Sequence, residues 1–116
     1  MGDESPGVVT DRSNQLPRGA LLGQPATVVQ FSSAFCQPCR ATRRVIEAAL
    51  NDLSDSFPGL AMIHIDADDN LDLTRSWSVD STPTVIFLDV EGREVYRASG
   101  QPRKADVIAA LARVCD

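Results

Sequence analysis

Two cysteines, Cys36 and Cys39, stand two residues apart in the stretch FCQPCR and are the side chains best suited to chemistry. Their spacing fits a metal clip, a structural disulfide or a redox-active dithiol. A zinc site needs about four ligands, and nothing in the sequence places the other candidates, His64 and Cys115, beside the pair. A structural disulfide would close only a very short loop and would remove little entropy from the unfolded chain. We therefore favour redox chemistry and expect no metal and no bound cofactor.

The cysteine pair lies between a predicted strand and a predicted helix. Residues 26–32, ATVVQFS, are rich in β-branched and aromatic side chains, which is typical of a strand. Residues 40–53 carry apolar side chains at the three-and-four spacing of a helix. Cys36 is then expected at the start of the helix, where unpaired N–H groups and the helix dipole favour a thiolate. Arg40, one turn along, is expected to lower the pKa of Cys36 further.

This placement gives the two sulfurs different roles. Cys36 is expected to attack a substrate disulfide, because the thiolate is the attacking species in disulfide exchange. Cys39, one helical turn further in, is expected to be more buried and to resolve the mixed disulfide. Pro38 is tolerated in the first helical turn, since its missing N–H would have no helical partner there, and it stiffens the loop between the sulfurs.

The rest of the pattern predicts an α/β fold. Further strands are expected at 61–66, 82–89 and 93–99, with helices over 67–77 and from Pro102 onward. The strand–helix–strand order implies parallel pairing with a right-handed crossover, and the final hairpin adds an antiparallel edge. We expect a central four-stranded mixed sheet with helices on both faces.

The length of 116 residues is that of one domain. Residues 1–25 are broken up by proline and glycine, so they are interpreted as a flexible lead-in to a domain over 26–116, with allowance for a short fifth strand near Val8 and Val9. No apolar run is long enough to span a bilayer, and no secretory signal is recognised. A cytoplasmic location is expected, the soluble part of a membrane-tethered protein being the alternative. The net charge of −5 argues against nucleic-acid binding.

From about Ala26 to Val114 the sequence resembles the thioredoxin family. The resemblance rests on strand-FCQPC-helix, IDADDN, WSVDSTPTVIFLDVEGREV and ASGQ, and its most specific part is the CxxC followed by Thr82-Pro83-Thr84 before a hydrophobic strand. It implies a thioredoxin fold and a monomeric thiol-disulfide oxidoreductase. Such a protein exchanges disulfides with protein substrates and receives electrons from a reductase or another dithiol donor.

The resemblance also implies a substrate-docking surface around Cys36. A cis Thr82-Pro83 bond would leave the Thr82 N–H and C=O available to pair with an extended substrate. Gly100 matches a family glycine whose missing side chain leaves room for the peptide. The expected surface comprises Phe35, Gln37, Pro38, Thr82, Pro83 and Gly100. Phe35 taken alone could instead be a core aromatic, but exposed aromatics commonly anchor contacts, which favours docking.

Two departures from the family pattern lie in the CxxC segment. Phe35 stands where the family usually has tryptophan, and Gln37-Pro38 stands where it usually has Gly-Pro. Changes in this dipeptide move the redox potential, so the sequence does not predict the direction of transfer. These departures motivate an alternative function, a thioredoxin-fold binding or scaffold module with little redox turnover.

A third departure concerns proton transfer. Gln30 stands where the family has a buried aspartate, and an amide cannot take a proton from Cys39. His64, the only histidine, stands where the family has a lysine on the next strand. With an ordinary pKa near 6.5, His64 could replace the missing base. The alternative is a strand histidine whose hydrogen bonds are satisfied and which has no catalytic part.

Overall fold

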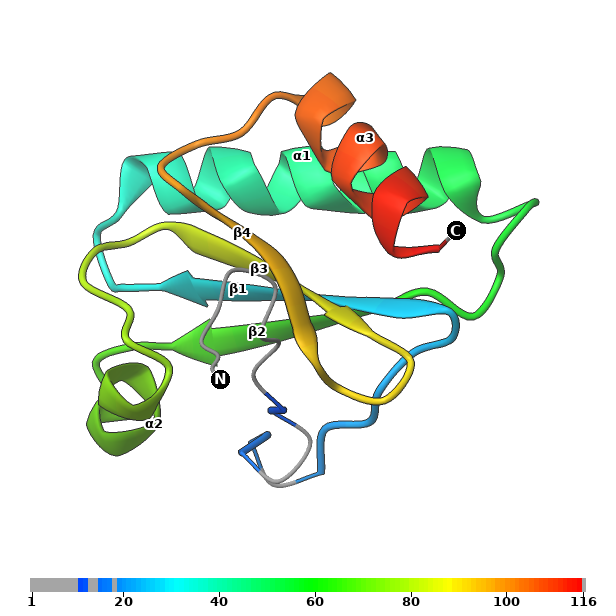
Figure 1. Cartoon of the computed structure of the whole chain (residues 1–116). Coiled ribbons are helices and arrows are strands. Elements are labelled where there is room, and N and C mark those ends of the chain that lie inside the picture. The colour runs from blue at the N-terminus through cyan, green and yellow to red at the C-terminus, as the bar shows by residue number, and fades with distance from the viewer. Residues whose placement is uncertain (1–10, 13–14, 18, 116) are drawn as a thin grey trace, which may run out of the picture.

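The structure, a computed structural model, describes residues 11–12, 15–17 and 19–115. Three helices and four strands follow one another in this part of the chain (Figure 1): β1 (Ala26–Ser32), α1 (Gln37–Leu53), β2 (Ala61–Asp66), α2 (Leu71–Ser76), β3 (Thr84–Asp89), β4 (Glu94–Ser99) and α3 (Lys104–Val114). The sheet order is β2-β1-β3-β4, with β1 and β2 parallel and the other two pairings antiparallel. The predicted four-stranded mixed sheet of a thioredoxin fold is confirmed.

Helix α1 begins where the placement of the cysteines predicts. It starts at Gln37, directly after Cys36, whose side chain caps the helix and accepts the Cys39 N–H, and Pro38 occupies the first turn. The other two helices start later than predicted, and α3 begins at Lys104 and not at Pro102. The residues predicted to open the second helix at 67 form a turn instead. In that turn the Asp66 side chain accepts the N–H groups of Asp68 and Asp69, so α2 begins only at Leu71.

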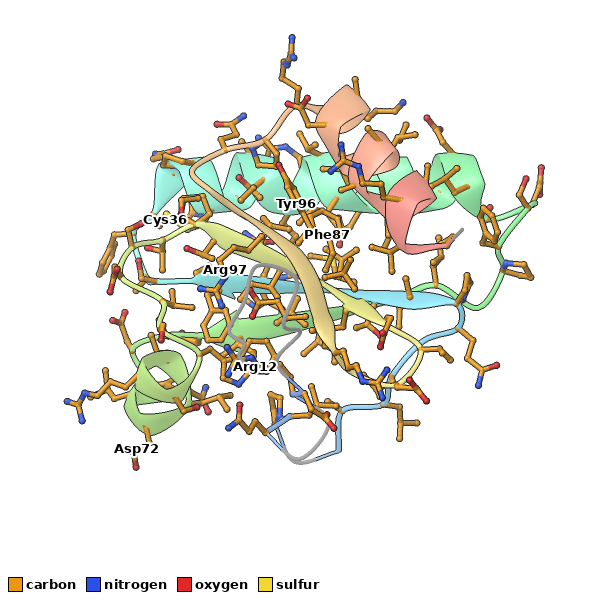
Figure 2. All side chains as sticks on the ribbon, viewed as in Figure 1. Arg12, Cys36, Asp72, Phe87, Tyr96 and Arg97 are labelled. Atoms are coloured by element: carbon orange, nitrogen blue, oxygen red, sulfur yellow. A yellow bond between two sulfur atoms is a disulfide. The ribbon has the colours of Figure 1, made fainter. Side chains whose placement is uncertain are left out.

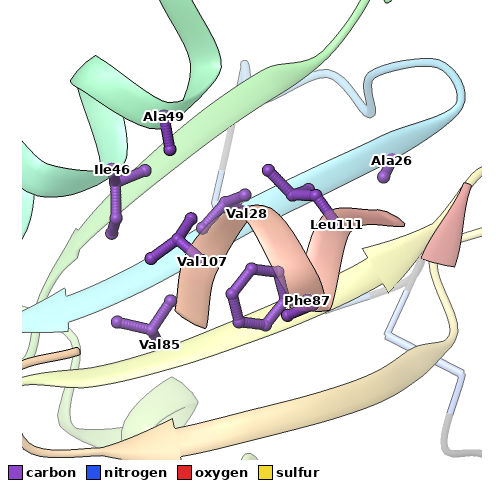
Figure 3. Packing of buried hydrophobic residues seen from close by; sticks show 9 residues of the cluster. Ala26, Val28, Ile46, Ala49, Val85, Phe87, Val107 and Leu111 are labelled. Atoms are coloured by element: carbon purple, nitrogen blue, oxygen red, sulfur yellow. The ribbon is translucent and has the colours of Figure 1, made fainter. Parts of the chain in front are cut away.

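The central strand β1 divides its side chains between two apolar clusters. All seven of its residues are buried, and successive side chains point to opposite faces. Ala26 and Val28 join the cluster beneath α1 and α3, in which Ile46 and Leu111 are fully buried (Figure 3). The long helix and the C-terminal helix therefore cover the same face of the sheet.

Trp77 is the centre of the opposite face. It is fully buried and its ring meets Phe31 edge-on at 5.3 Å between centroids. Helix α2 lies on this side of the sheet (Figure 1). Partly buried residues from the segment before β1 pack against the same cluster: Leu16, Ala20 and Leu22.

The described part of the N-terminal segment therefore contacts the sheet. Asp11 forms an isolated antiparallel bridge with Arg93, and the Arg12 N–H donates to the Gly92 carbonyl at 2.7 Å. The division into a lead-in over 1–25 and a domain from residue 26 stays a prediction. The expected short strand near Val8 and Val9 lies outside the described residues.

A bulge in β4 builds an ion-pair network on this second face. The pairing register shifts between Phe87 and Leu88 and leaves Val95 as an extra residue. Such an insertion puts side chains three positions apart on one face, here Glu94 and Arg97. Glu94 accepts hydrogen bonds from Arg97 at 2.6 and 2.7 Å and from the 6%-exposed Arg12 at 3.2 and 3.4 Å (Figure 2 labels both arginines).

Candidate active site

Cys36 and Cys39 form a disulfide at the N-terminus of α1, and their Cα atoms are 5.2 Å apart. Cys36 lies at the end of α1 that is farthest from α3 (Figure 2). It is half-buried, whereas Cys39 is only 4% exposed. An incoming disulfide can thus approach the first sulfur more readily than the second.

One backbone N–H group is directed at the Cys36 sulfur. The Cys39 N–H donates to Cys36 Sγ, with 3.2 Å between nitrogen and sulfur, and it also donates to the Cys36 carbonyl. Together with the helix dipole, this donor stabilises negative charge at the position of the cap. When the disulfide is reduced, the same donor is available to a Cys36 thiolate.

The loop before β3 is joined to the loop that carries Cys36. The Thr82-Pro83 peptide bond is cis, in agreement with the resemblance. Thr82 Oγ1 and Ser33 Oγ are hydrogen-bonded at 2.9 Å, and the Gly100 N–H donates to the Pro83 carbonyl at 2.9 Å. Three segments that are distant in sequence therefore meet beside the loop that carries the dithiol.

Phe35 projects from this meeting point. It is 96% exposed and has a φ of 62°, in the left-handed region that a bulky residue rarely adopts. The core-aromatic interpretation is therefore excluded. Gln37 and Pro38 are also exposed, so the three neighbours of the cysteines face solvent.

Gly100 also has a left-handed backbone, with a φ of 83°. A Cβ placed on it would meet no atom within 4 Å, so the backbone conformation, rather than crowding within the chain, favours glycine. The space beside Gly100 is open, as the docking interpretation requires.

A pocket of about 200 Å³ adjoins the disulfide. Its walls come from the ends of β1 and β2 and from the first two turns of α1; among them are Ser32, Cys36, Cys39, Arg40, Arg43, His64 and Asp66. Sequence reasoning missed Ser32, Arg43 and Asp66. The signal was present, because the carboxyl ends of adjacent parallel strands meet at one edge of a sheet.

Gln30 and His64 are register partners on β1 and β2. Gln30 is fully buried, and its Nε2 donates to the Cys39 carbonyl at 2.8 Å, while its Oε1 has no hydrogen-bond partner in the described part of the chain. The amide thus fixes the backbone of Cys39 and supplies no titratable group behind its sulfur.

His64 lies in the dithiol pocket, with its Nε2 hydrogen-bonded to Ser32 Oγ. His64 is exposed, but partial burial of its ring lowers its pKa below 6.5, and the charge of Arg43 lowers this pKa further. These two effects together outweigh the negative charge of Asp66, which raises the pKa. The neutral imidazole is therefore the main form near pH 7.

The described residues contain neither a candidate metal-binding cluster nor a membrane-spanning helix. No three His, Cys, Asp or Glu side chains among them are grouped so that they could hold a metal ion. No helix within the described ranges has the length and apolar character needed to cross a membrane.

A four-stranded mixed sheet with a dithiol at the start of its long helix and a cis-proline loop beside it defines a thioredoxin-fold dithiol protein. The structure overlaps with thioredoxin of Malassezia sympodialis at a TM-score of 0.67, with 18% identity, 82% of this chain and 79% of that one covered. For Fasciola hepatica thioredoxin the TM-score is 0.66, with 25% identity and coverages of 89% and 86%. The family model described as Thioredoxin matches residues 18–113. The chain belongs to the thioredoxin family.

Curated relatives agree with this assignment. Thioredoxin H4-1 of Oryza sativa subsp. japonica is 34% identical over 87 residues, which is 73% of this chain and 63% of that protein. Putative thioredoxin H10 of Arabidopsis thaliana is 33% identical over 73 residues, 63% of this chain and 44% of that protein. The match therefore spans less than two thirds of either relative.

Proposed function

We propose that this protein is a thiol-disulfide oxidoreductase that exchanges disulfides with protein partners. The observation that carries the proposal is the Cys36–Cys39 disulfide at the N-terminus of α1, with the first sulfur accessible and the second nearly buried. Membership of the thioredoxin family and the adjoining cis-proline loop support it. No feature of the described residues favours the alternative of a binding or scaffold module with little redox turnover.

The exchange uses the two sulfurs in sequence. The Cys36 thiolate attacks one sulfur of the substrate disulfide, whose S–S bond breaks and whose other sulfur leaves as a thiolate. The Cys39 thiolate then attacks Cys36 Sγ in the mixed disulfide. This step forms the Cys36–Cys39 bond and releases the second substrate thiolate, so two electrons pass to the substrate. A reductase or another dithiol protein returns the pair to the reduced form.

The substrate docks on the exposed surface around Cys36. An extended peptide would pair with the backbone of Thr82 as an added strand. It would lie against Pro83 and pass over the open space at Gly100. Phe35, with almost its whole side chain in solvent, would provide an apolar anchor next to the reacting sulfur, and Gln37 and Pro38 would complete the surface.

His64 is proposed as the proton acceptor for Cys39. The resolving thiol has to lose its proton before it attacks, and Gln30 cannot accept that proton. His64 lines the same pocket as Cys39, and its lowered pKa keeps it neutral near pH 7. Its hydrogen bond to Ser32 Oγ orients the ring. Arg40 is proposed to favour the Cys36 thiolate through its charge.

The proposal includes a monomeric protein in the cytoplasm. The negative net charge suits a protein that remains dispersed. The alternative location is that of a domain tethered to a membrane.

Reduction of insulin with dithiothreitol as the electron source tests the activity. The wild-type protein should accelerate precipitation of the insulin chains, and Cys36→Ser should abolish the acceleration. Cys39→Ser that has been reduced and then freed of dithiothreitol should instead accumulate a mixed disulfide with insulin, detectable by mass spectrometry and released when excess dithiothreitol is added. If the wild-type protein gives no acceleration, the oxidoreductase proposal is wrong and the scaffold function is favoured.

The role of His64 is tested by the pH dependence of the resolving step. Below its pKa the imidazole is protonated and cannot accept a proton, so the wild-type rate should rise with pH through a value below 6.5. His64→Gln should lack this rise, while alkylation of Cys36 should keep its wild-type rate. An unchanged pH profile of resolution in His64→Gln would show that His64 is only a strand residue.

A further inference from the structure

Positive charge is concentrated on one wall of the dithiol pocket in a chain whose net charge is −5. This wall is formed by α1 and contributes Arg40 and Arg43 to the pocket lining. Arg43 is engaged, because its Nε lies 3.3 Å from an Oε of Glu47. Arg40 is exposed and makes no ion pair with any described residue. It is therefore the cation of the pocket whose charge remains available to a ligand.

The other titratable groups of the pocket are not paired with Arg40. Asp66, on the β2 side, carries a negative charge but makes no ion pair with Arg40; its Oδ1 instead accepts the N–H groups of Asp68 and Asp69. His64 contributes little charge near pH 7, since partial burial and Arg43 lower its pKa. The pocket thus presents a guanidinium on its α1 side, one helical turn from Cys36.

The size of the pocket favours one side chain as its occupant. Sites for whole small molecules measure about 300–1,000 Å³, whereas this pocket measures about 200 Å³. A peptide whose cysteine reacts with Cys36 would bring a neighbouring side chain to the pocket. A carboxylate is the group that a planar guanidinium binds best, through two parallel hydrogen bonds.

We propose that Arg40 binds a carboxylate of the incoming substrate, so that the protein prefers protein disulfides with an acidic residue next to the reacting cysteine. This inference rests on the proposed disulfide exchange and names the substrate class of the same site. The acidic remainder of the protein opposes such substrates only weakly, because charges more than about 8 Å apart are largely screened at physiological ionic strength. A direct contact with Arg40 therefore decides the preference.

The test uses three disulfide-linked peptides that differ only in the residue next to the reacting cysteine, which is Glu, Gln or Lys. The wild-type protein should reduce them with kcat/KM in the order Glu, Gln, Lys. In Arg40→Ala the Glu-to-Gln ratio should fall about two- to fivefold, the range of one exposed charge pair, and in Arg40→Glu the order should reverse. Raising the salt concentration should shrink the wild-type ratio toward that of Arg40→Ala.

Arg44→Ala is the matched control. Arg44 lies on the same helix, is also exposed and makes no ion pair with a described residue, but it does not line the pocket. This variant removes the same charge and should keep the wild-type Glu-to-Gln ratio. Far-ultraviolet circular dichroism should show all variants folded, because the substituted side chains are on the surface.

The outcomes separate this inference from the activity on which it rests. Reduction of the Gln peptide reports the disulfide exchange alone, and its absence in the wild-type protein would overturn both proposals. Reduction of the Gln peptide with the same Glu-to-Gln ratio in wild type and Arg40→Ala would overturn only the substrate preference. An equal slowing of all three peptides in Arg40→Ala would show that Arg40 acts on Cys36 and not on the substrate.

Discussion

Replacement of Glu94 by glutamine should lower the free energy of unfolding, although Glu94 is far from Cys36 and Cys39 in the sequence. The carboxylate accepts hydrogen bonds from two guanidinium groups, those of Arg12 and Arg97. Arg12 also donates to the Ser76 carbonyl at 3.1 Å and lies 5.0 Å from the centre of the Trp77 ring. Glu94→Gln removes the one negative charge between the two cations and offers them a single neutral acceptor.

The expected loss is about 2 kcal/mol of unfolding free energy, within the range for hydrogen bonds to a charged group. It should be smaller than the 3–5 kcal/mol typical of a broken, fully buried pair, because the Arg97 side chain is 29% exposed. For a chain of this size such a loss lowers Tm by about 8 °C. Urea unfolding can be followed by the fluorescence of Trp77, the only tryptophan, which is fully buried in the folded state.

The pH dependence provides a second measurement. Burial raises the pKa of Glu94, but the hydrogen bonds and charges of Arg97 and then of Arg12 outweigh it, so the pKa lies below 4.5. The carboxylate thus contributes stability above pH 4.5, and this contribution is lost as pH falls through the lower folded-state pKa. The difference between wild type and Glu94→Gln should shrink over that acidic range.

Glu47→Gln is the matched control, since Glu47 pairs with Arg43 on the surface and its side chain is 55% exposed. It should change the unfolding free energy by less than about 0.5 kcal/mol. Equal urea midpoints for Glu94→Gln, Glu47→Gln and wild type at pH 7 would refute the role assigned to the network.

Two other substitutions test the packing of the sheet. Ile46→Ala should lower the unfolding free energy by about 3 kcal/mol, because the side chain is fully buried between α1 and the sheet and its removal leaves a cavity. Urea titration measures this loss, and a value below about 1 kcal/mol would contradict the packing described. Gly23→Ala should lower Tm, because the new Cβ would lie 2.5 Å from Ala61 N and 2.6 Å from Ala26 O. Both are backbone atoms that cannot move without disturbing β1 and β2, so an unchanged Tm in calorimetry would contradict that close approach.

The strands and the dithiol position could be predicted from the sequence because local signals agree there. β1 and β2 have the predicted bounds, since runs such as ATVVQFS and AMIHID combine β-branched content with abrupt polar ends. The place of Cys36 at the start of α1 followed from the strand before it and the helical stripe after it. The pocket shared by His64 and Asp66 was partly predictable, because both lie near the carboxyl end of β2, beside that of β1.

The features that were not predicted depend on long-range contacts. Arg12 stands in a segment punctuated by glycine and proline, and its partners Ser76 and Glu94 lie 64 and 82 positions away. No local pattern indicates that such an arginine is buried. Likewise, the left-handed backbone of Phe35 has no sequence signature, because a bulky residue in that conformation is held there by its surroundings.

The contacts of residues 16–22 have a consequence for shortening the chain. A variant that starts at Ala26 would lose the cover that Leu16, Ala20 and Leu22 give to the Trp77 cluster. It would also lack Arg12, whose guanidinium donates to Glu94 together with that of Arg97. Uncovered apolar surface of this kind promotes self-association, so the shortened protein would tend to precipitate even though its dithiol is intact.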